Sequence, residues 1–451
     1  MAGRRDYPQP QRGGRWPRHK TGVVPFTSIL NIISFELSKL PLSRFPFLKM
    51  NIMKKSLIPT TAAMLAASLH LTAFAADDYT VHEWGTFTTV IGSDGTHLDG
   101  VYREDAPLPK FVYQLDAPPQ IAPEVARRTK GLNYSRTFAH VNIRLETPVI
   151  YFYTEKAFDA QVDVGFKNGT IGQWYPDRSA GEQRQRQSLL DFAKPRQGSI
   201  RWNVHVEPAG EDQSSRVFRS GELPCWLYPR YPDSALVTNA KKETEKYLFY
   251  RGLGRVELPV VFTASDRELH ATNRGKHKIA EWLVFDLNEK GNARWWSPDP
   301  IAVTGGVTVP LDNQPYRADW KKALYADGQK MLMDAGLYRK EADAMLQTWW
   351  ASYFETTGLR VFWIVPRAKV DEILPLKVSP TPKDTVRVIV GRSEILIPSF
   401  EKRLVSDFAA VNGREKGNRW ESDRFFPAYS ARVKQLKAPV VGGIAGGSAN
   451  N

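Results

Sequence analysis

A single cysteine, Cys225, stands in this sequence of 451 residues. One cysteine excludes an intramolecular disulfide and a paired Cys-x-x-Cys metal site. The chain also lacks a G-x-S-x-G nucleophile turn, a phosphate-binding loop and an H-E-x-x-H zinc helix. The missing motifs argue against the enzyme classes that each of them identifies. The missing disulfide leaves the hydrophobic core as the source of stability.

Strongly basic clusters are also scarce outside the first 55 residues. Residues 1–55 hold eleven Lys or Arg and two acidic residues, which accounts for nine of the formal net charge of +14. The rest of the chain carries only about five excess positive charges. Nucleic-acid binding requires basic residues clustered on one face. The charge pattern therefore argues against a nucleic-acid partner.

Long apolar runs are absent, and the most apolar short run has the features of a secretory signal peptide. Met53-Lys54-Lys55 supplies positive charge, Ala62–Phe74 forms the apolar core, and Ala73-Phe74-Ala75 gives a small-x-small cleavage site. This run is shorter than the ~20 apolar residues of a transmembrane helix. We therefore expect residues 50–75 to be a signal peptide and the mature product to carry no membrane span.

The leader has two consequences for the rest of the chain. A signal peptide stands at a true N-terminus, so residues 1–49 are expected to be a non-native upstream extension. The mature protein is expected to begin near Ala76 and to be exported to the periplasm or the cell exterior.

From Tyr79 to about residue 313 the sequence favours strands. Short segments rich in Val, Thr and aromatic residues alternate with Gly, Pro, Asn and Asp. The Asn168-Gly169 dipeptide between Val162–Phe166 and Thr170–Tyr175 predicts a β-hairpin that pairs these two strands. Many short strands without long helices between them indicate a sandwich. We predict a mainly β fold in which residues 76–313 form an antiparallel, sandwich-like region.

Residues 314–434 are predicted to form a smaller α/β unit. Helical spacing over Asp319–Asp334 and Lys340–Glu355 indicates a helical hairpin. On the second helix Trp349 shares a face with Met345 and Tyr353, so we expect it to be buried against the strand Leu359–Val365 that follows. The Gly- and Asn-rich segment 435–451 is expected to be a disordered tail.

Histidines and carboxylates near the start of the β region are the candidates for chemistry. The candidate catalytic residues are His82, Glu83, His97, His140 and Glu146. Neighbouring residues on a strand point to opposite faces, so His82 and Glu83 do not serve one site from a regular strand. A turn that carries His97 can fold back toward the preceding strand, which makes His82 and His97 the candidate metal ligands. Each histidine also has an ordinary structural interpretation, and the cofactor stays unknown.

Two other patterns have both a functional and a structural interpretation. The Gly-x-Gly at Gly252 and Gly254, flanked by Arg251 and Arg255, is typical of an anion-binding nest or of a bulge in a sheet. Paired aromatic residues such as Trp349-Trp350 either stack on sugar rings or fill the core between layers. Sequence alone leaves both alternatives open.

Four runs resemble a set of exported bacterial proteins. They are VHEWGTFT at 81–88, ETPVIYFY at 146–153, EKYLFYRGLG at 245–254 and LRVFWIVPR at 359–367. The resemblance implies export and a bacterial envelope setting, and it supplies no catalytic residue.

Two functions follow as hypotheses. The first is an exported binding or structural module that recognises a glycan or another envelope component through exposed aromatic side chains. The alternative is a hydrolase or a metal-dependent enzyme with its site near His82 and His97. Ionisable groups that converge in a cleft would favour the enzyme, and an aromatic surface without them would favour binding.

Overall fold

The computed structural model describes residues 79–105, 108–115, 137–183, 189–210, 216–217, 224–411 and 417–437. The predicted upstream extension (1–49), the signal peptide (50–75) and most of the predicted tail (435–451) lie outside these residues. Within the described part of the chain the fold is mainly β, as predicted.

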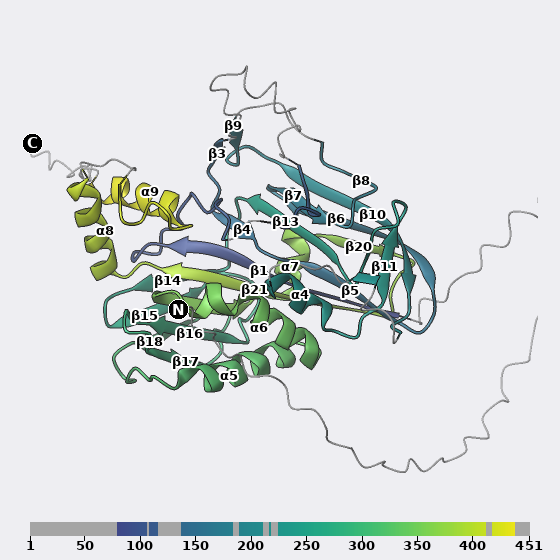
Figure 1. The fold of residues 1–451 in the computed structure, drawn as a ribbon. Coiled ribbons are helices and arrows are strands. Elements are labelled where there is room, and N and C mark those ends of the chain that lie inside the picture. Colours follow the sequence, from purple (N-terminus) through teal and green to yellow (C-terminus); the bar gives the residue numbers. More distant parts are fainter. Residues whose placement is uncertain are drawn as a thin grey trace, which may run out of the picture. The chain divides into compact units, whose positions relative to one another are not determined.

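The largest sheet has ten strands and combines segments from the two predicted regions, 76–313 and 314–434. Its first strand, β1 (Tyr79–Ile91), pairs in parallel with β21 (Asp384–Ile395) along twelve positions, from Thr80 opposite Asp384 to Ile91 opposite Ile395. Figure 1 shows these two strands side by side. The order across the sheet is β17 (Ala293–Trp296), β16 (Trp282–Leu287), β19 (Gly358–Ile364), β21, β1, β4 (Ile143–Leu145), β13 (Leu248–Gly254), β7 (Gly169–Tyr175) and β2 (Tyr113–Gln114), and β5 (Val149–Thr154) pairs with β1 and β13.

A six-stranded sheet packs on one face of the large sheet. Phe158 of the smaller sheet contacts the ring of Tyr79, and Trp202 contacts that of Tyr250, across a shared hydrophobic core. This packing confirms the sandwich-like arrangement. The smaller sheet has the order β12 (Thr244–Glu245), β11 (Leu236–Asn239), β10 (Gln197–Glu207), β6 (Phe158–Lys167) and β20 (Leu376–Ser379), with β8 (Ala180–Gly181) on β10.

Two smaller sheets complete the strands of the described residues. One consists of β14 (Val260–Ala264), β15 (Glu268–Asn273) and β18 (Gly306–Pro310), and the other of β3 (Thr137–Ala139) and β9 (Leu189–Asp191). Among the described residues of 79–313, the strand pairings are antiparallel except that of β3 with β9. Most of the predicted antiparallel pairing is therefore present.

Two long helices cover the other face of the large sheet. The predicted helical hairpin is confirmed as α5 (Trp320–Asp334) and α6 (Arg339–Phe354), whose apolar side chains share a core with Trp84 and Phe362 of the sheet. The remaining helices are α4 (Pro224–Leu227), the 3-10 helix η1 (Tyr228–Arg230), α7 (Arg367–Ile373), α8 (Pro398–Ala410) and α9 (Phe426–Lys437). Among the described residues, every helix is too short or too polar to span a lipid bilayer.

The predicted hairpin at Asn168-Gly169 is wrong. The strand before the turn, β6, pairs with β10 and β20, whereas the strand after it, β7, pairs with β13 and β2. Asn168 does adopt a positive φ of 56°, as the dipeptide favours. Its amide donates to the carbonyl of Arg196, and its carbonyl accepts from the amide of Arg255. The turn is therefore a corner at which the chain leaves one sheet for the other.

Candidate functional site

His82 is buried in a structural contact between β1 and α6. Its Nδ1 lies 2.8 Å from Oε2 of Glu341, whose other oxygen accepts a hydrogen bond of 2.9 Å from the Tyr153 hydroxyl. The rings of Tyr153 and Tyr338 pack against the imidazole, and only 2% of His82 is exposed. The polar groups around His82 are thus engaged within the protein.

Glu83 points to the opposite face of β1, as strand alternation predicts. Its carboxylate accepts hydrogen bonds of 2.6 Å from Nε of Arg387 and from the Tyr250 hydroxyl. Arg387 also donates to Asp371. Glu83 is fully buried in this chain of contacts.

The predicted pairing of His82 with His97 is wrong, because the two residues lie at opposite ends of β1. His97 forms a bridge with Ile91, nine residues after His82, and a strand rises ~3.3 Å per residue, which separates the histidines by roughly 30 Å. No group of three or more His, Cys, Asp or Glu residues within the described ranges is placed to hold a metal ion.

The other two histidine candidates each contact a protein partner through Nδ1, and Nε2 of His97 is buried without a partner among the described residues. Asn142 Nδ2 lies 3.2 Å from Nδ1 of His97, and burial lowers the pKa of His97 to about 4, so this imidazole is neutral at neutral pH. His140 is half-exposed and contacts Asp191 at 2.7 Å. Neither joins the site that Glu146 occupies.

Glu146 is the predicted candidate that the structure places in a concentrated polar site. It is 1% exposed, and its carboxylate contacts Arg424 and, at 3.4 Å, Nε of Arg144. Burial alone would raise the pKa of Glu146, but the guanidinium groups of Arg424 and Arg144 outweigh burial and lower the pKa to about 2. Glu146 is therefore an ionised carboxylate held by cations.

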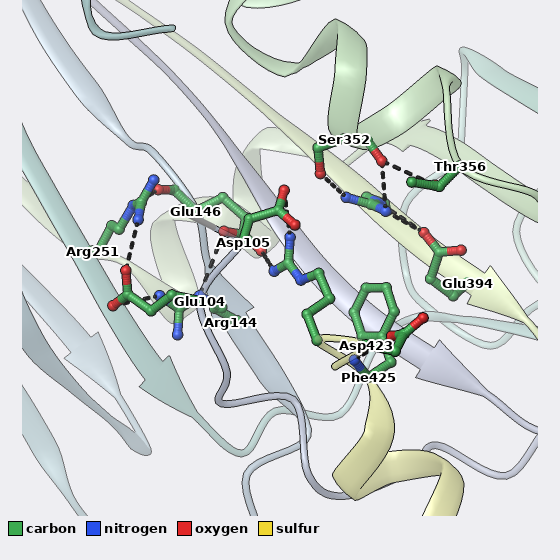
Figure 2. Close-up of polar contacts among 12 residues, drawn as sticks. Glu104, Asp105, Arg144, Glu146, Arg251, Ser352, Thr356, Glu394, Asp423 and Phe425 are labelled. Carbon is green, nitrogen blue, oxygen red and sulfur yellow. Dashed lines mark hydrogen bonds and ion pairs between the residues drawn. The ribbon is translucent and has the colours of Figure 1, made fainter. Parts of the chain in front are cut away.

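The ion pairs continue on both sides of Glu146. Arg424 also contacts Asp105 at 3.2 Å, and Arg144 contacts Glu104 at 3.1 Å. Figure 2 shows Glu104, Asp105 and Glu146 between Arg251 on one side and Ser352 and Glu394 on the other. We call this set the arginine network. It consists of two ion-paired groups, one of Glu104, Asp105, Arg144, Glu146, Arg251 and Arg424 and one of Arg360, Arg392 and Glu394.

Strand register explains why these charges meet. Thr88 of β1 lies opposite Arg144 of β4 on one side and opposite Arg392 of β21 on the other. Residues directly opposite one another in neighbouring strands project from the same face. Glu146 and Glu394 each follow two residues after an arginine, so the period of two returns them to that face, toward α6.

A cavity of about 380 Å³ adjoins the arginine network, which is within the usual size range of small-molecule sites. One side consists of β5 and β13 and another of α6, and Trp226 of α4 also lines the cavity. Arg251 and Asp105 bring the network to the cavity. The described lining residues are Asp105, Leu108, Thr147, Val149, Trp226, Pro229, Tyr247, Phe249, Arg251, Thr348, Trp349, Ala351, Ser352 and Thr356.

Two buried polar atoms of the lining residues have no partner among the described residues. They are Nε1 of Trp349 and Oγ1 of Thr147. Such atoms are uncommon in folded proteins, because a buried group without a hydrogen bond costs ~1–3 kcal/mol. Both side chains line the cavity, and these two atoms are themselves closed to water.

Sequence reasoning selected Glu146 and singled out Arg251, but it missed Arg144, Arg360, Arg392 and Arg424. The usable signal was a charge repeat inside apolar strand sequence: Arg144-Leu145-Glu146 and Arg392-Ser393-Glu394. Each places opposite charges two residues apart, hence on one face of a strand. The Gly-x-Gly after Arg251 proves to be part of β13, with an irregular register between Arg251 and Gly252. The interpretation as a sheet bulge was therefore correct.

Comparison with known proteins gives no family. No protein-family model matches the chain, and no curated protein matches it. Among solved structures, the chain is similar to the zebrafish Fcho1 Mu homology domain with bound Eps15 peptide, at 7% identity and a TM-score of 0.26 over 70% of this chain and 96% of that one.

Two further solved structures are yeast delta-COP-I mu-homology domains. One is in complex with a Dsl1 WxWxV peptide, at 8% identity, a TM-score of 0.25 and coverage of 71% of this chain and 98% of that one. The other has 9% identity, a TM-score of 0.24 and coverage of 71% and 97%. Similarity at this level carries no inference about what this chain binds.

Proposed function

We propose that this chain is an exported binding module of the bacterial envelope or cell exterior, and that its cavity takes a ring of a glycan. The observation that carries the proposal is the cavity itself. The aromatic side chains of Trp226, Tyr247, Phe249 and Trp349 line it together with hydroxyl and guanidinium groups. Aromatic rings stack on the apolar faces of sugar rings, and polar groups of this kind bind sugar hydroxyls.

Binding is favoured over glycoside hydrolysis by the state of Glu146. Hydrolysis of a glycosidic bond needs one carboxylic acid with a raised pKa to protonate the leaving group. The pKa of Glu146 is instead lowered to about 2, and Arg424 occupies the carboxylate. The arginine network therefore favours a structural role for Glu146 beside the cavity over a role as an acid catalyst.

Thr147→Val tests the cavity as a binding site. The substitution keeps the shape of the side chain and removes the buried hydroxyl, so the ligand-free protein is expected to be as stable as wild type or more stable. Affinity for a bound saccharide is expected to fall about tenfold, which corresponds to one lost hydrogen bond. Thermal shift over a panel of neutral and acidic oligosaccharides would find the ligand, and calorimetry would measure the affinity.

Thr272→Val in β15 is the matched control, because Thr272 does not line the cavity. It is expected to leave saccharide affinity unchanged. If no saccharide shifts the melting temperature of wild type, or if Thr147→Val binds as tightly as wild type, the glycan-binding proposal is wrong.

Export makes a separate prediction. Protein recovered from the envelope or the medium of its native host is expected to begin within about two residues of Ala76, because the small-x-small site precedes that residue. N-terminal sequencing and peptide mass mapping would measure this. Peptides from residues 1–49 in the exported material would contradict both the cleavage and the assignment of that segment.

A further inference from the structure

Arg251 is the arginine of the network with the weakest carboxylate partner. Its Nη1 lies 3.5 Å from Oε2 of Glu104, and its Nε donates to the backbone carbonyl of Glu146, which carries no net charge. The other four arginines each have a carboxylate contact at 3.2 Å or less: Arg144 with Glu104, Arg360 and Arg392 with Glu394, and Arg424 with Asp105 and Glu146.

The partner that Arg251 has is shared. The other oxygen of Glu104, Oε1, lies 3.1 Å from Nη2 of Arg144 and also accepts a hydrogen bond from Nε2 of Gln173. Glu104 therefore divides its charge between two guanidinium groups. The Nη2 of Arg251 has no hydrogen-bond partner among the described residues.

Arg251 is also the arginine that lines the cavity in the described residues. Its guanidinium carbon lies 5.7 Å from the ring centroids of Trp226, Phe249 and Trp349. Its side chain is only 11% exposed, and burial lowers the pKa of this guanidinium relative to an ordinary arginine. Water therefore compensates its charge poorly, and an anion that enters the cavity gains a strong, little-screened partner.

The other charged group of the lining, Asp105, is partly neutralised, because it shares Arg424 with Glu146. Asp105 is ion-paired with Arg424, so a positive charge lies 3.2 Å from its carboxylate. The remaining polar lining is made of hydroxyl groups from Thr147, Thr348, Ser352 and Thr356. Arg251 is thus the cationic side chain of the described lining, and Glu146 and Glu104 are the carboxylates that already act on its charge.

From this geometry we infer that the ligand carries a carboxylate on its ring, as in a uronic acid, and that Arg251 is its specificity-determining residue. The carboxylate receives hydrogen bonds from the terminal nitrogens of Arg251, while the ring lies against the aromatic walls. This inference rests on the proposed glycan-binding function and adds the charge of the sugar to it.

The test compares an oligosaccharide that ends in glucuronic acid with the same oligosaccharide ending in glucose. Wild-type full-length protein is expected to bind the acidic probe about ten- to hundredfold more tightly than the neutral probe, as a charge-assisted hydrogen-bond pair supplies. Arg251→Gln is expected to abolish this preference, and Arg251→Lys to retain part of it because the charge stays. Arg201→Gln, which removes an exposed cation of β10 far from the cavity lining, is the matched control and keeps the preference.

The ratio of the two affinities is the readout, because a merely structural loss lowers both affinities together and leaves their ratio unchanged. Equal binding of both probes by wild type overturns the inference and leaves the glycan proposal standing. Binding of neither probe overturns the glycan proposal as well. If the protein binds benzoate but neither saccharide, the carboxylate part of the inference stands and the proposal that the ligand is a sugar is wrong. If Arg251→Gln does not fold, the test uses Arg251→Lys and the double variant Arg251→Lys/Glu104→Gln. A ratio of acidic-probe to neutral-probe affinity equal to that of wild type in both variants counts against the inference.

Discussion

Replacing Glu146 with glutamine is expected to lower the free energy of unfolding by about 3–5 kcal/mol, because Arg424 and Arg144 lose the buried counterion that they share. Each arginine then keeps one partly exposed carboxylate, Asp105 or Glu104. Both arginines are nearly as buried as Glu146 itself. Urea denaturation followed by intrinsic tryptophan fluorescence would measure the loss. Asp163→Asn is the matched control, because its ion pair with Arg201 is partly exposed and is worth only about 0–1 kcal/mol.

The same variant is expected to lose part of the acid sensitivity of the protein. The pKa of Glu146 is lowered from 4.5 to about 2 in the folded protein, so its contribution to stability is complete above pH 4.5. That contribution is lost as the pH falls from about 4.5 to 2, where the folded carboxylate is protonated. The stability of wild type should therefore fall more steeply over this interval than that of Glu146→Gln. If the stability of the two proteins fell in parallel with pH, Glu146 would not be the ionised carboxylate that causes the acid sensitivity.

Truncation of Trp349 to alanine is expected to cost about 3–5 kcal/mol, the usual loss for a buried tryptophan. As the helical spacing predicted, Trp349 is buried, with 6% of its surface exposed. Its ring stacks on Tyr353 at 5.3 Å, and Tyr353 stacks in turn on Phe362 of β19 at 5.4 Å. The truncation would break this aromatic link between α6 and the large sheet.

The control for Trp349→Ala is Leu436→Ala in α9, because Leu436 is 41% exposed. Removal of an exposed side chain is expected to change stability by no more than ~0.5 kcal/mol. Chemical denaturation of both variants separates burial from a general intolerance of alanine. An unchanged midpoint in Trp349→Ala would mean that this ring is not packed in the core.

Local patterns predicted the local parts of the fold. The helical period gave α5 and α6 nearly to the residue, and the apolar run after Gly358 gave β19. Strand alternation also separated His82 from Glu83 correctly. Each of these features depends on residues fewer than about twenty positions apart, which is the range over which hydrophobic periodicity acts.

Features that depend on distant segments were missed for a physical reason. The pairing of β1 with β21 joins residues about three hundred positions apart, and nothing in either strand specifies the other. At Asn168 the turn conformation was predictable, but the partners of the flanking strands were set by β10 and β13. The arginine network arises where β4, β13, β21 and the segment before α9 converge, so Glu146 was visible as a candidate and its cations were not.

The parallel pairing of β1 with β21 also constrains the order in which the chain reaches its folded state. β1 is a central strand of the large sheet, with β21 on one side and β4 and β5 on the other. During synthesis from the N-terminus, one long edge of β1 has no partner until residues 384–395 have emerged. Contacts this distant in sequence slow folding, and an unpaired strand edge invites association with other chains. The large sheet is therefore complete only after nearly all of the described chain has been made. This order favours folding after synthesis, and until then the unpaired edge of β1 needs protection from association with other chains.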